Sequence, residues 1–131
     1  MVIDVDFYVL PNGEEPARIF LDSLNLKMRA KMYREIDLLI KNGPELHGPH
    51  SKHVEDGIFE LRAKQGSDIS RVMYFFFYGG KAILTNGFIK KTDKTPKSAI
   101  DLAKNTARIM SFVIVKEYRK WEAILSIAMQ P

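Results

Sequence analysis

Three runs of strand-forming residues in the middle of the chain constrain its fold more than any other feature. They are Ile58–Ala63, Ile69–Tyr78 and Ala82–Ile89, and each is rich in β-branched and aromatic side chains. The turn-forming residues Gly66-Ser67-Asp68 and Gly79-Gly80 separate them. Because strands joined by short turns pair as antiparallel neighbours, the sequence predicts a mostly antiparallel sheet with the most apolar run at its centre.

The third run contains the pair Asn86-Gly87, which elsewhere is a hairpin signal. Apolar residues flank this pair closely on both sides. We therefore expect a kink or bulge within one strand, at a point where the glycine lets another group approach the backbone.

The segments on either side of these runs predict one N-terminal strand and three helices. Residues 3–10 have strand character, and a helix is expected to open at Glu14-Glu15-Pro16. A second helix follows and ends at Gly43-Pro44, so the two form a hairpin. The last helix begins with Thr95 as its N-cap and Pro96 at its first position. A break is conceivable at the β-branched residues 112–115.

Composition supports a single α+β domain covering residues 1–131. The chain is 46% hydrophobic, which suffices for one core, and it has no cysteine. This excludes disulfides and thiolate metal sites. No apolar run approaches the roughly 18–20 residues that span a bilayer, and the N-terminus lacks the basic region of a signal peptide. We expect a cytoplasmic protein with no membrane association.

The net charge of +4 is unevenly distributed, since bases outnumber acids between Arg62 and Arg108. An even, solubilising surface is one explanation. The other is an anionic partner, either a nucleic acid or an acidic protein surface, bound by the second half of the chain.

Three histidines lie in the Pro/Gly-containing segment 43–57, which we expect to be a loop. His47, His50 and His53 have no distant ligand pair, so we predict no metal site, and solvated loop histidines are the simpler interpretation. His53, beside Lys52 and nearest the sheet, is the best candidate for an acid or base at the rim of a site.

Two arginines are expected on adjacent strands. Strand alternation places Glu60 and Arg62 on one face, and Arg71 begins the next strand. They are either exposed arginines paired with Glu60 or Asp68, or a clamp that binds phosphate oxygens bidentately.

Four lysines follow the third run. Lys90 and Lys91 end a strand, and Lys94 and Lys97 flank the predicted helix start at Thr95, whose free N–H groups attract anions. A run of this kind is often only a solvated face. Its position predicts phosphate binding, and because neighbouring cations lower a lysine pKa, one of these lysines could act as a base or acid. Lys94, Lys97 and Lys52 would supply general attraction for a nucleic acid.

Several short motifs occur together in a particular order: residues 57–62, 70–76, 86–91 and 94–96. Over residues 5–110, this order and spacing resemble the phage-derived, HigB-like branch of the RelE/ParE toxin superfamily. The resemblance implies a compact sheet with helices packed on one face. It also implies the toxin of a type II toxin–antitoxin pair, which enters the ribosomal A site and cleaves mRNA until a helix-turn-helix antitoxin neutralises it.

By the same resemblance, Arg62 and Arg71 would hold the phosphate, and Lys90 and Lys91 would sit at the cleaved bond, with no cofactor. The family most often has a histidine where this chain has Asn86. Any catalytic role of that histidine is therefore lost or moved.

Two other functions remain open. A ParE-like inhibitor of DNA gyrase would share the fold without needing the basic residues. A non-enzymatic RNA-binding module would use Phe75, Phe76 and Phe77 for base stacking, although consecutive residues of a strand face opposite sides, so burial is the better explanation. The aromatic tail after Met110 lies outside the resemblance. It either contacts the antitoxin or packs on the domain, and packing is the expectation.

Overall fold

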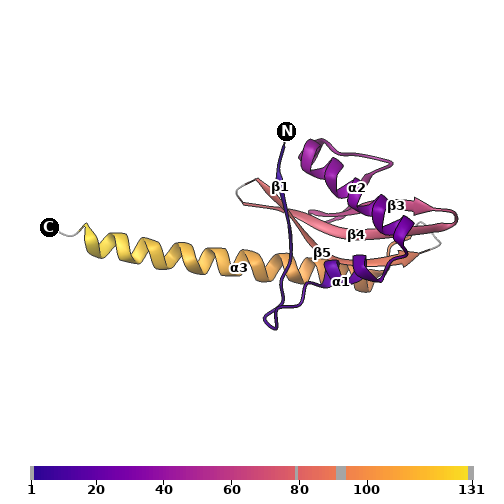
Figure 1. Ribbon diagram of the computed structural model, residues 1–131. Coiled ribbons are helices and arrows are strands. Elements are labelled where there is room, and N and C mark those ends of the chain that lie inside the picture. Colours follow the sequence, from indigo (N-terminus) through magenta and orange to yellow (C-terminus); the bar gives the residue numbers. More distant parts are fainter. Residues whose placement is uncertain (1, 79, 91–93, 130–131) are drawn as a thin grey trace.

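A computed structural model describes residues 2–78, 80–90 and 94–129 of the chain (Figure 1). The elements, in chain order, are β1 (Asp4–Phe7), α1 (Pro16–Ser23), α2 (Leu26–Asn42), the 3-10 turn η1 (Gly43–Glu45), β2 (Ser51–Glu55), β3 (Ile58–Gln65), β4 (Asp68–Phe77), β5 (Lys81–Lys90) and α3 (Lys97–Ala128). The predicted α+β class, the helical hairpin and the three sequential strands are confirmed. Within these residues, no helix has the length and apolar character needed to cross a bilayer.

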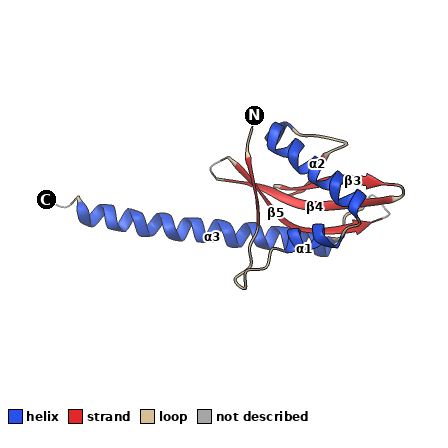
Figure 2. Cartoon of the chain, viewed as in Figure 1, coloured by secondary structure: helices blue, strands red, loops and turns tan. Residues whose placement is uncertain are grey.

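The five strands form one mixed sheet in the order β1-β5-β4-β3-β2 (Figure 2). Strands β2 to β5 pair antiparallel, as their short turns predict. The N-terminal strand β1 pairs parallel with β5, the last strand in the chain. The middle of the sheet is therefore built from the three runs that the sequence identifies most clearly.

Strand β2 is an element that the sequence does not reveal, because residues 43–57 were expected to be a loop. Only Ser51 of this strand is buried, and Lys52, His53 and Glu55 are exposed. An edge strand of charged residues lacks the apolar alternation by which strands are recognised, and charges of this kind protect an edge from unwanted pairing. As a result, His53 lies on a strand and not in a loop.

Helices cover both faces of the sheet, which corrects the expectation of helices on one face only. Helices α1 and α2 pack over one face, where Leu21 and Met32 meet Leu61 and Tyr74 in the larger core. Helix α3 packs against the other face in a smaller core. The three consecutive phenylalanines divide between the two cores, with Phe76 on the first side and Phe75 and Phe77 on the second. Their packing confirms a buried central strand and leaves no aromatic platform for base stacking.

Strand β5 runs straight through Asn86-Gly87, so these residues form no hairpin turn. The pairing of β4 with β5 shifts register next to Thr85, which is the expected bulge. A Cβ atom built on Gly87 would lie 2.2 Å from Cδ2 of Phe20 in helix α1. The glycine therefore lets the Phe20 ring approach the sheet closely.

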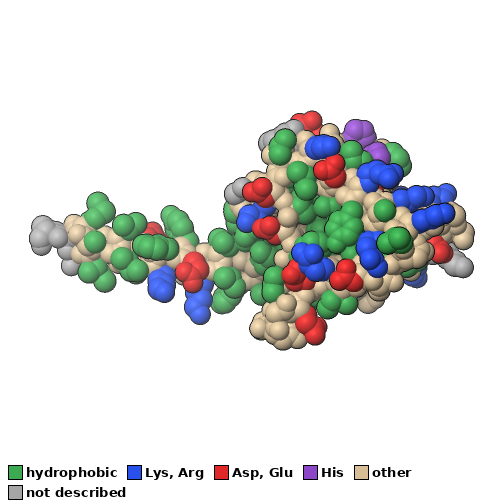
Figure 3. Space-filling view, viewed as in Figure 1, with side chains coloured by type: hydrophobic (Ala, Val, Ile, Leu, Met, Phe, Trp, Pro, Cys, Tyr) green, Lys and Arg blue, Asp and Glu red, His purple; other side chains and the backbone are tan. Residues whose placement is uncertain are grey.

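Helix α3 is continuous from Lys97 to Ala128, so the conceivable break at residues 112–115 does not occur. Its first part packs on the sheet through Ile100 and Ala103, and the rest projects away from the domain (Figure 1). Figure 3 shows hydrophobic side chains along this projecting part. Phe112, Tyr118 and Trp121 are 69%, 69% and 61% exposed, so the expectation that the tail packs on its own domain is wrong.

Candidate functional site

Five side chains at one end of strands β3, β4 and β5 share a face of the sheet. Arg62 lies directly opposite Arg71, and Ile69 pairs with Lys64 on one side and Lys90 on the other. Residues two apart on a strand face the same side of a sheet. The row of Arg62 and Arg71 and the next row of Lys64, Ile69 and Lys90 therefore form one surface. It lies next to the start of α3, on the face that this helix covers further along. We call the surface formed by Arg62, Lys64 and Lys90 the basic patch.

The two arginines differ in their exposure. Arg71 is fully buried, with its guanidinium carbon 5.9 Å from the centroid of the Phe88 ring. The side chain of Arg62 keeps 24% of its surface exposed. Only Arg62 can touch a phosphate from solvent in this arrangement. The predicted clamp of two arginines therefore reduces to one contacting residue and one buried beneath it.

The carboxylate of Glu60 links these arginines. It is 1% exposed, and its Oε1 lies 3.5 Å from Nε of Arg62 and 3.7 Å from Nε of Arg71. The pairing of the arginines with Glu60 matches the structural alternative considered for them, but the pair with Arg71 is buried and not exposed. A charge held this far from water needs such counter-charges.

Glu60 also accepts a hydrogen bond from the hydroxyl of Thr95. Thr95 was expected to cap α3, but Pro96 is the N-cap residue and no side chain caps the helix. The Thr95 hydroxyl is used to fasten the segment before α3 to strand β3. Asn86 fastens the same helix start from β5, since its side-chain amide donates to the carbonyl of Ala99.

One cavity of about 280 Å³ collects several of the other predicted residues. It is lined by Lys52, His53, Val54, Glu55, Glu60, Lys94, Thr95 and Ile100. Lys52 and Lys94, far apart in sequence, are thus brought together beside the buried carboxylate of Glu60. Lys97, the first residue of α3, is exposed and follows Lys94 closely in the sequence.

His53 has two structural contacts at this cavity. Its Nε2 accepts a hydrogen bond from the backbone N–H of Gly57 at 3.3 Å, and its ring meets Phe59 edge-on. Both contacts hold the ring in place. One ring nitrogen is thereby occupied by the chain itself, which weakens the case for His53 as a proton carrier.

Helix α3 is tied to the rim of this cavity by Lys104. Its ammonium group binds the carboxylates of Glu55 and Asp56. The bond with Asp56 is the main cause that raises the pKa of Lys104, and the same bond lowers the pKa of Asp56. Lys104 therefore stays charged and joins the β2–β3 turn to α3.

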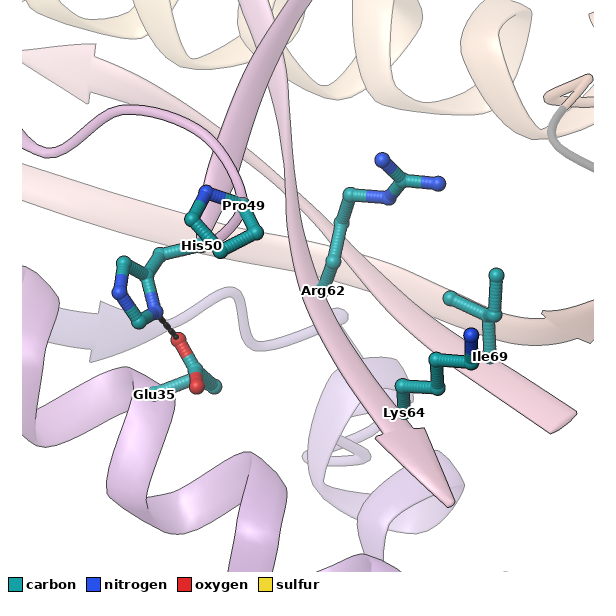
Figure 4. A pocket seen from close by; sticks show the side chains of 6 residues that line it. All are labelled: Glu35, Pro49, His50, Arg62, Lys64 and Ile69. Carbon is teal, nitrogen blue, oxygen red and sulfur yellow. Dashed lines mark hydrogen bonds and ion pairs between the residues drawn. The ribbon is translucent and has the colours of Figure 1, made fainter. Parts of the chain in front are cut away.

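A second cavity, of about 350 Å³, adjoins the basic patch and contains a histidine–carboxylate pair (Figure 4). Its lining residues are Glu35, Pro49, His50, Arg62, Lys64 and Ile69. Nδ1 of His50 lies 2.8 Å from Oε2 of Glu35, and the histidine side chain is 40% exposed. In Figure 4, the Arg62 side chain extends away from this pair, and Lys64 and Ile69 lie beyond it.

Sequence reasoning named Glu60 as a partner of the arginines but did not foresee its burial, and it missed Lys64 and the pair of His50 with Glu35. Lys64 follows Arg62 by two residues, so strand alternation was sufficient to find it. The pair of His50 with Glu35 depends on how α2 lies against the chain before β2, and no local spacing signals that contact. Lys91 falls outside the described residues. Among the residues described, no three His, Asp or Glu side chains are grouped as metal ligands would be.

Comparison with known protein families identifies a match. A protein family described as "Phage derived protein Gp49-like (DUF891)" matches residues 19–108. The matched region runs from α1 into α3 and includes every residue of the basic patch. No curated protein matches the chain.

Proposed function

The chain belongs to the phage-derived Gp49-like family, and from that premise we propose that it is the toxin of a type II toxin–antitoxin pair. In this proposal it is an endoribonuclease that cleaves mRNA on the ribosome and is neutralised by a helix-turn-helix antitoxin. The observation that carries the proposal is the basic patch, which places Arg62, Lys64 and Lys90 on one face above buried Arg71.

RNA cleavage of this type needs no cofactor. The 2′-OH of one nucleotide attacks the adjacent phosphate, forming a 2′,3′-cyclic phosphate and releasing the 5′-oxygen of the next nucleotide. The enzyme must align the attack, stabilise the extra negative charge, remove one proton and supply another. Arg62 and Lys90 suit the stabilisation of charge, because Arg62 is a partly exposed and Lys90 an exposed cation on the same face of the sheet.

Glu60 and Arg71 act from beneath this surface. Their buried position excludes contact with RNA, but the Glu60 carboxylate faces both arginines and the Thr95 hydroxyl. Glu60 is therefore a positioning residue that holds Arg62 and the segment before α3 in relation to each other.

Proton transfer has more than one candidate. Lys90, Lys91 and His53 are those indicated by the sequence. His50 suits the role better than His53, because the Glu35 carboxylate orients its ring through Nδ1 and its cavity also contains Arg62. A histidine that acts as acid or base accounts for roughly 10²–10⁴-fold in rate.

The test is cleavage of a defined mRNA on purified ribosomes, mapped by primer extension. Arg62→Ala and Lys90→Ala should each reduce the cleavage rate by about 10²-fold or more, as expected for loss of a transition-state charge partner. Lys27→Ala changes an exposed lysine on α2, the helix that packs on the opposite face of the sheet from the patch, and is the matched control that should cleave normally. Equal cleavage by all three variants would refute the assignment of the patch.

The same experiment separates the proposal from its alternatives. A ParE-like inhibitor would leave mRNA intact and block supercoiling by purified gyrase. A non-enzymatic RNA-binding module would bind the message without producing cuts. Either result overturns the nuclease proposal.

The histidine assignment needs its own comparison. His50→Gln should lower the cleavage rate, whereas His47→Gln should not, because His47 pairs with the backbone carbonyl of Glu45 and does not line the cavity that contains Arg62. If the two variants behave alike, His50 is not the proton carrier.

A further inference from the structure

The projecting part of α3 is an apolar surface that its own domain does not cover. From Ile109 onward, twelve large hydrophobic side chains line the helix, and all but Met110 are at least 38% exposed: Ile109, Met110, Phe112, Val113, Ile114, Val115, Tyr118, Trp121, Ile124, Leu125, Ile127 and Met129. In proteins, most of the stability of a helix comes from packing its apolar face against a neighbour. A helix of this composition is normally buried against something.

This surface is separate from the proposed nuclease function. The match to the Gp49-like family ends at Arg108, immediately before the exposed segment. The basic patch lies at the opposite end of α3, near Lys97. The proposed role of the projecting helix therefore does not depend on the proposed cleavage of RNA.

One stripe along the helix has the spacing of a coiled-coil seam. The stripe consists of Ala107, Met110, Ile114, Tyr118, Trp121, Leu125 and Ala128. Its steps of three and four residues average about 3.5, the repeat that keeps one face toward a partner helix. The same stripe begins on the sheet, where Ala107 and Met110 pack on the smaller core. The buried face of α3 thus continues beyond the domain as an unoccupied seam.

An apolar groove lies at the base of the projecting helix. It has a volume of about 410 Å³ and is lined by Tyr8, Val9, Pro11, Phe77, Ile109, Met110, Val113 and Ile114. A partner helix running along the seam toward the domain would end in this groove.

We propose that a second copy of this chain occupies the seam and the groove, with the two helices antiparallel. Pairing Tyr118 of one copy with Trp121 of the other also pairs Ile114 with Leu125. The same register brings Met129 of each copy level with Met110 of the other, so each tip enters the partner's groove. A parallel pair would bring the two tips together and leave both grooves empty.

Charge supports the antiparallel arrangement. Glu117 and Glu122 flank the Tyr118–Trp121 turn on opposite sides of the stripe. In a parallel pair, Glu117 of one copy would lie beside Glu122 of the other, and like charges at these flanking positions repel. Antiparallel pairing separates them. It also places Glu117 within reach of Lys120 of the second copy, since both lie on the same flank.

The contact area predicts a dimer of moderate affinity. Aromatic side chains bury about 150–250 Å² each, and Tyr118 and Trp121 are each more than 60% exposed before pairing. With the aliphatic positions and the tip in the groove, the total reaches the order of 1,000 Å², at the lower end of specific interfaces. We therefore expect dissociation in the micromolar range.

Analytical ultracentrifugation of the full chain alone tests the proposal. The 15.0 kDa monomer should convert to a species of twice that mass between about 1 and 100 µM. Trp121→Glu and Leu125→Glu should each keep the chain monomeric over this range, with circular dichroism confirming the fold. Phe112→Glu is the matched control, because Phe112 is more exposed than Trp121 but lies on the opposite side of the helix.

Two results would overturn the second-copy proposal. One is a monomer at every concentration, whether the helix then binds a different protein, a lipid surface or its own domain. The other is equal dissociation by Phe112→Glu and Trp121→Glu, which would mean nonspecific apolar association.

The direction of pairing has a separate test. Because the chain has no cysteine, Arg108→Cys gives a single site for a spin label on an exposed residue. At 1.5 Å rise per residue, antiparallel pairing in this register separates the two labels by about 35 Å. Parallel pairing would place them level across two adjacent helices, about 10–15 Å apart, and would refute the arrangement.

Discussion

Glu60 is a buried carboxylate that faces two guanidinium groups and one hydroxyl. Because it has almost no contact with water, its charge is tolerated only through these partners. The three partners come from different parts of the chain: β3 itself, β4 and the residues before α3. One side chain therefore couples the packing of the sheet to the placement of the segment that carries Lys94.

Replacement of Glu60 tests this coupling. Glu60→Gln should lower the free energy of unfolding by about 3 kcal/mol, the low end of the range for breaking buried ion pairs, because both ion pairs are long. Urea denaturation measures the loss. Glu14→Gln changes an exposed acid and should leave the midpoint unchanged. The double variant Glu60→Leu, Arg71→Met removes both buried charges and should recover part of the stability, and a further loss instead would contradict this view of the pair.

Gly87 is a second position where one residue decides the packing. Gly87→Ala places a methyl group 2.2 Å from an atom of the Phe20 ring. Overpacking of this kind should lower the free energy of unfolding by about 1–3 kcal/mol.

The control for this change is Gly48→Ala, where an added Cβ meets no atom within 4 Å. Chemical denaturation should therefore leave Gly48→Ala close to the wild type. In the Gly87→Ala background, Phe20→Leu should relieve the clash and restore part of the stability. If the losses in free energy of unfolding from the two substitutions simply add, the contact with Phe20 is not the cause of the destabilisation.

Helix α3 consists of two parts with different roles. Residues up to Met110 contact the sheet and the smaller core. Of the residues beyond Met110, those that the structure describes (111–129) contribute no side chain to either core of the domain. The stability of the domain should accordingly depend on the first part alone.

Truncation after Ser111 checks this division. The shortened chain should keep its secondary structure and melt at the same temperature as the full-length Trp121→Glu variant, in which pairing is also prevented. Ala103→Asp, within the buried part, should unfold the domain, because it places an unpaired charge at a position with no exposed surface. Thermal denaturation followed by circular dichroism gives both results, and unfolding of the truncated chain would contradict the division.

The elements differ in how well the sequence predicts them. The strands around Phe75 and the ends of α2 at Asn42-Gly43 follow from apolar runs and turn residues, which act locally. Strand β2 was missed because Lys52 and His53 gain their strand conformation from pairing with β3. The role of Thr95 was misassigned because the buried Glu60 carboxylate competes for its hydroxyl.

The candidate site was likewise predicted only as far as local signals allow. Arg62 and Arg71 were placed as neighbours because strand pairing follows from the turn between them. The burial of Arg71 was not predictable from alternation, since it depends on how Phe88 and the start of α3 cover that face. Likewise, Glu35 reaches His50 only through the tertiary position of α2.

Part of the positive charge of the molecule lies where RNA is proposed to bind. The net charge is +4, the basic patch lies on β3 and β5, and the cavity that holds Lys52 and Lys94 is lined by β2, β3 and the residues that lead into α3. Binding that depends on such charges releases counterions from the nucleic acid and weakens as salt rises.

The salt dependence of RNA binding therefore reports on all the charges of the binding surface together. For a single-stranded RNA oligonucleotide, a plot of log K against log salt should be linear, and each lost phosphate contact should reduce the slope by about 0.7. Lys90→Ala and Arg62→Ala should each show this reduction, and Lys27→Ala should not. An unchanged slope in all three variants would place the RNA elsewhere on the protein.

The parallel pairing of β1 with β5 has a consequence for how the protein is made. Asp4 leaves the ribosome early, yet its partner Lys81 follows only after two helices and three further strands have emerged. Contacts between such distant residues form slowly and late in folding. Likewise, Lys90 joins the face that carries Arg62 only once β5 has been synthesised. A nascent chain therefore has an incomplete sheet for most of its synthesis, and the sheet is completed only when its last strand pairs with its first.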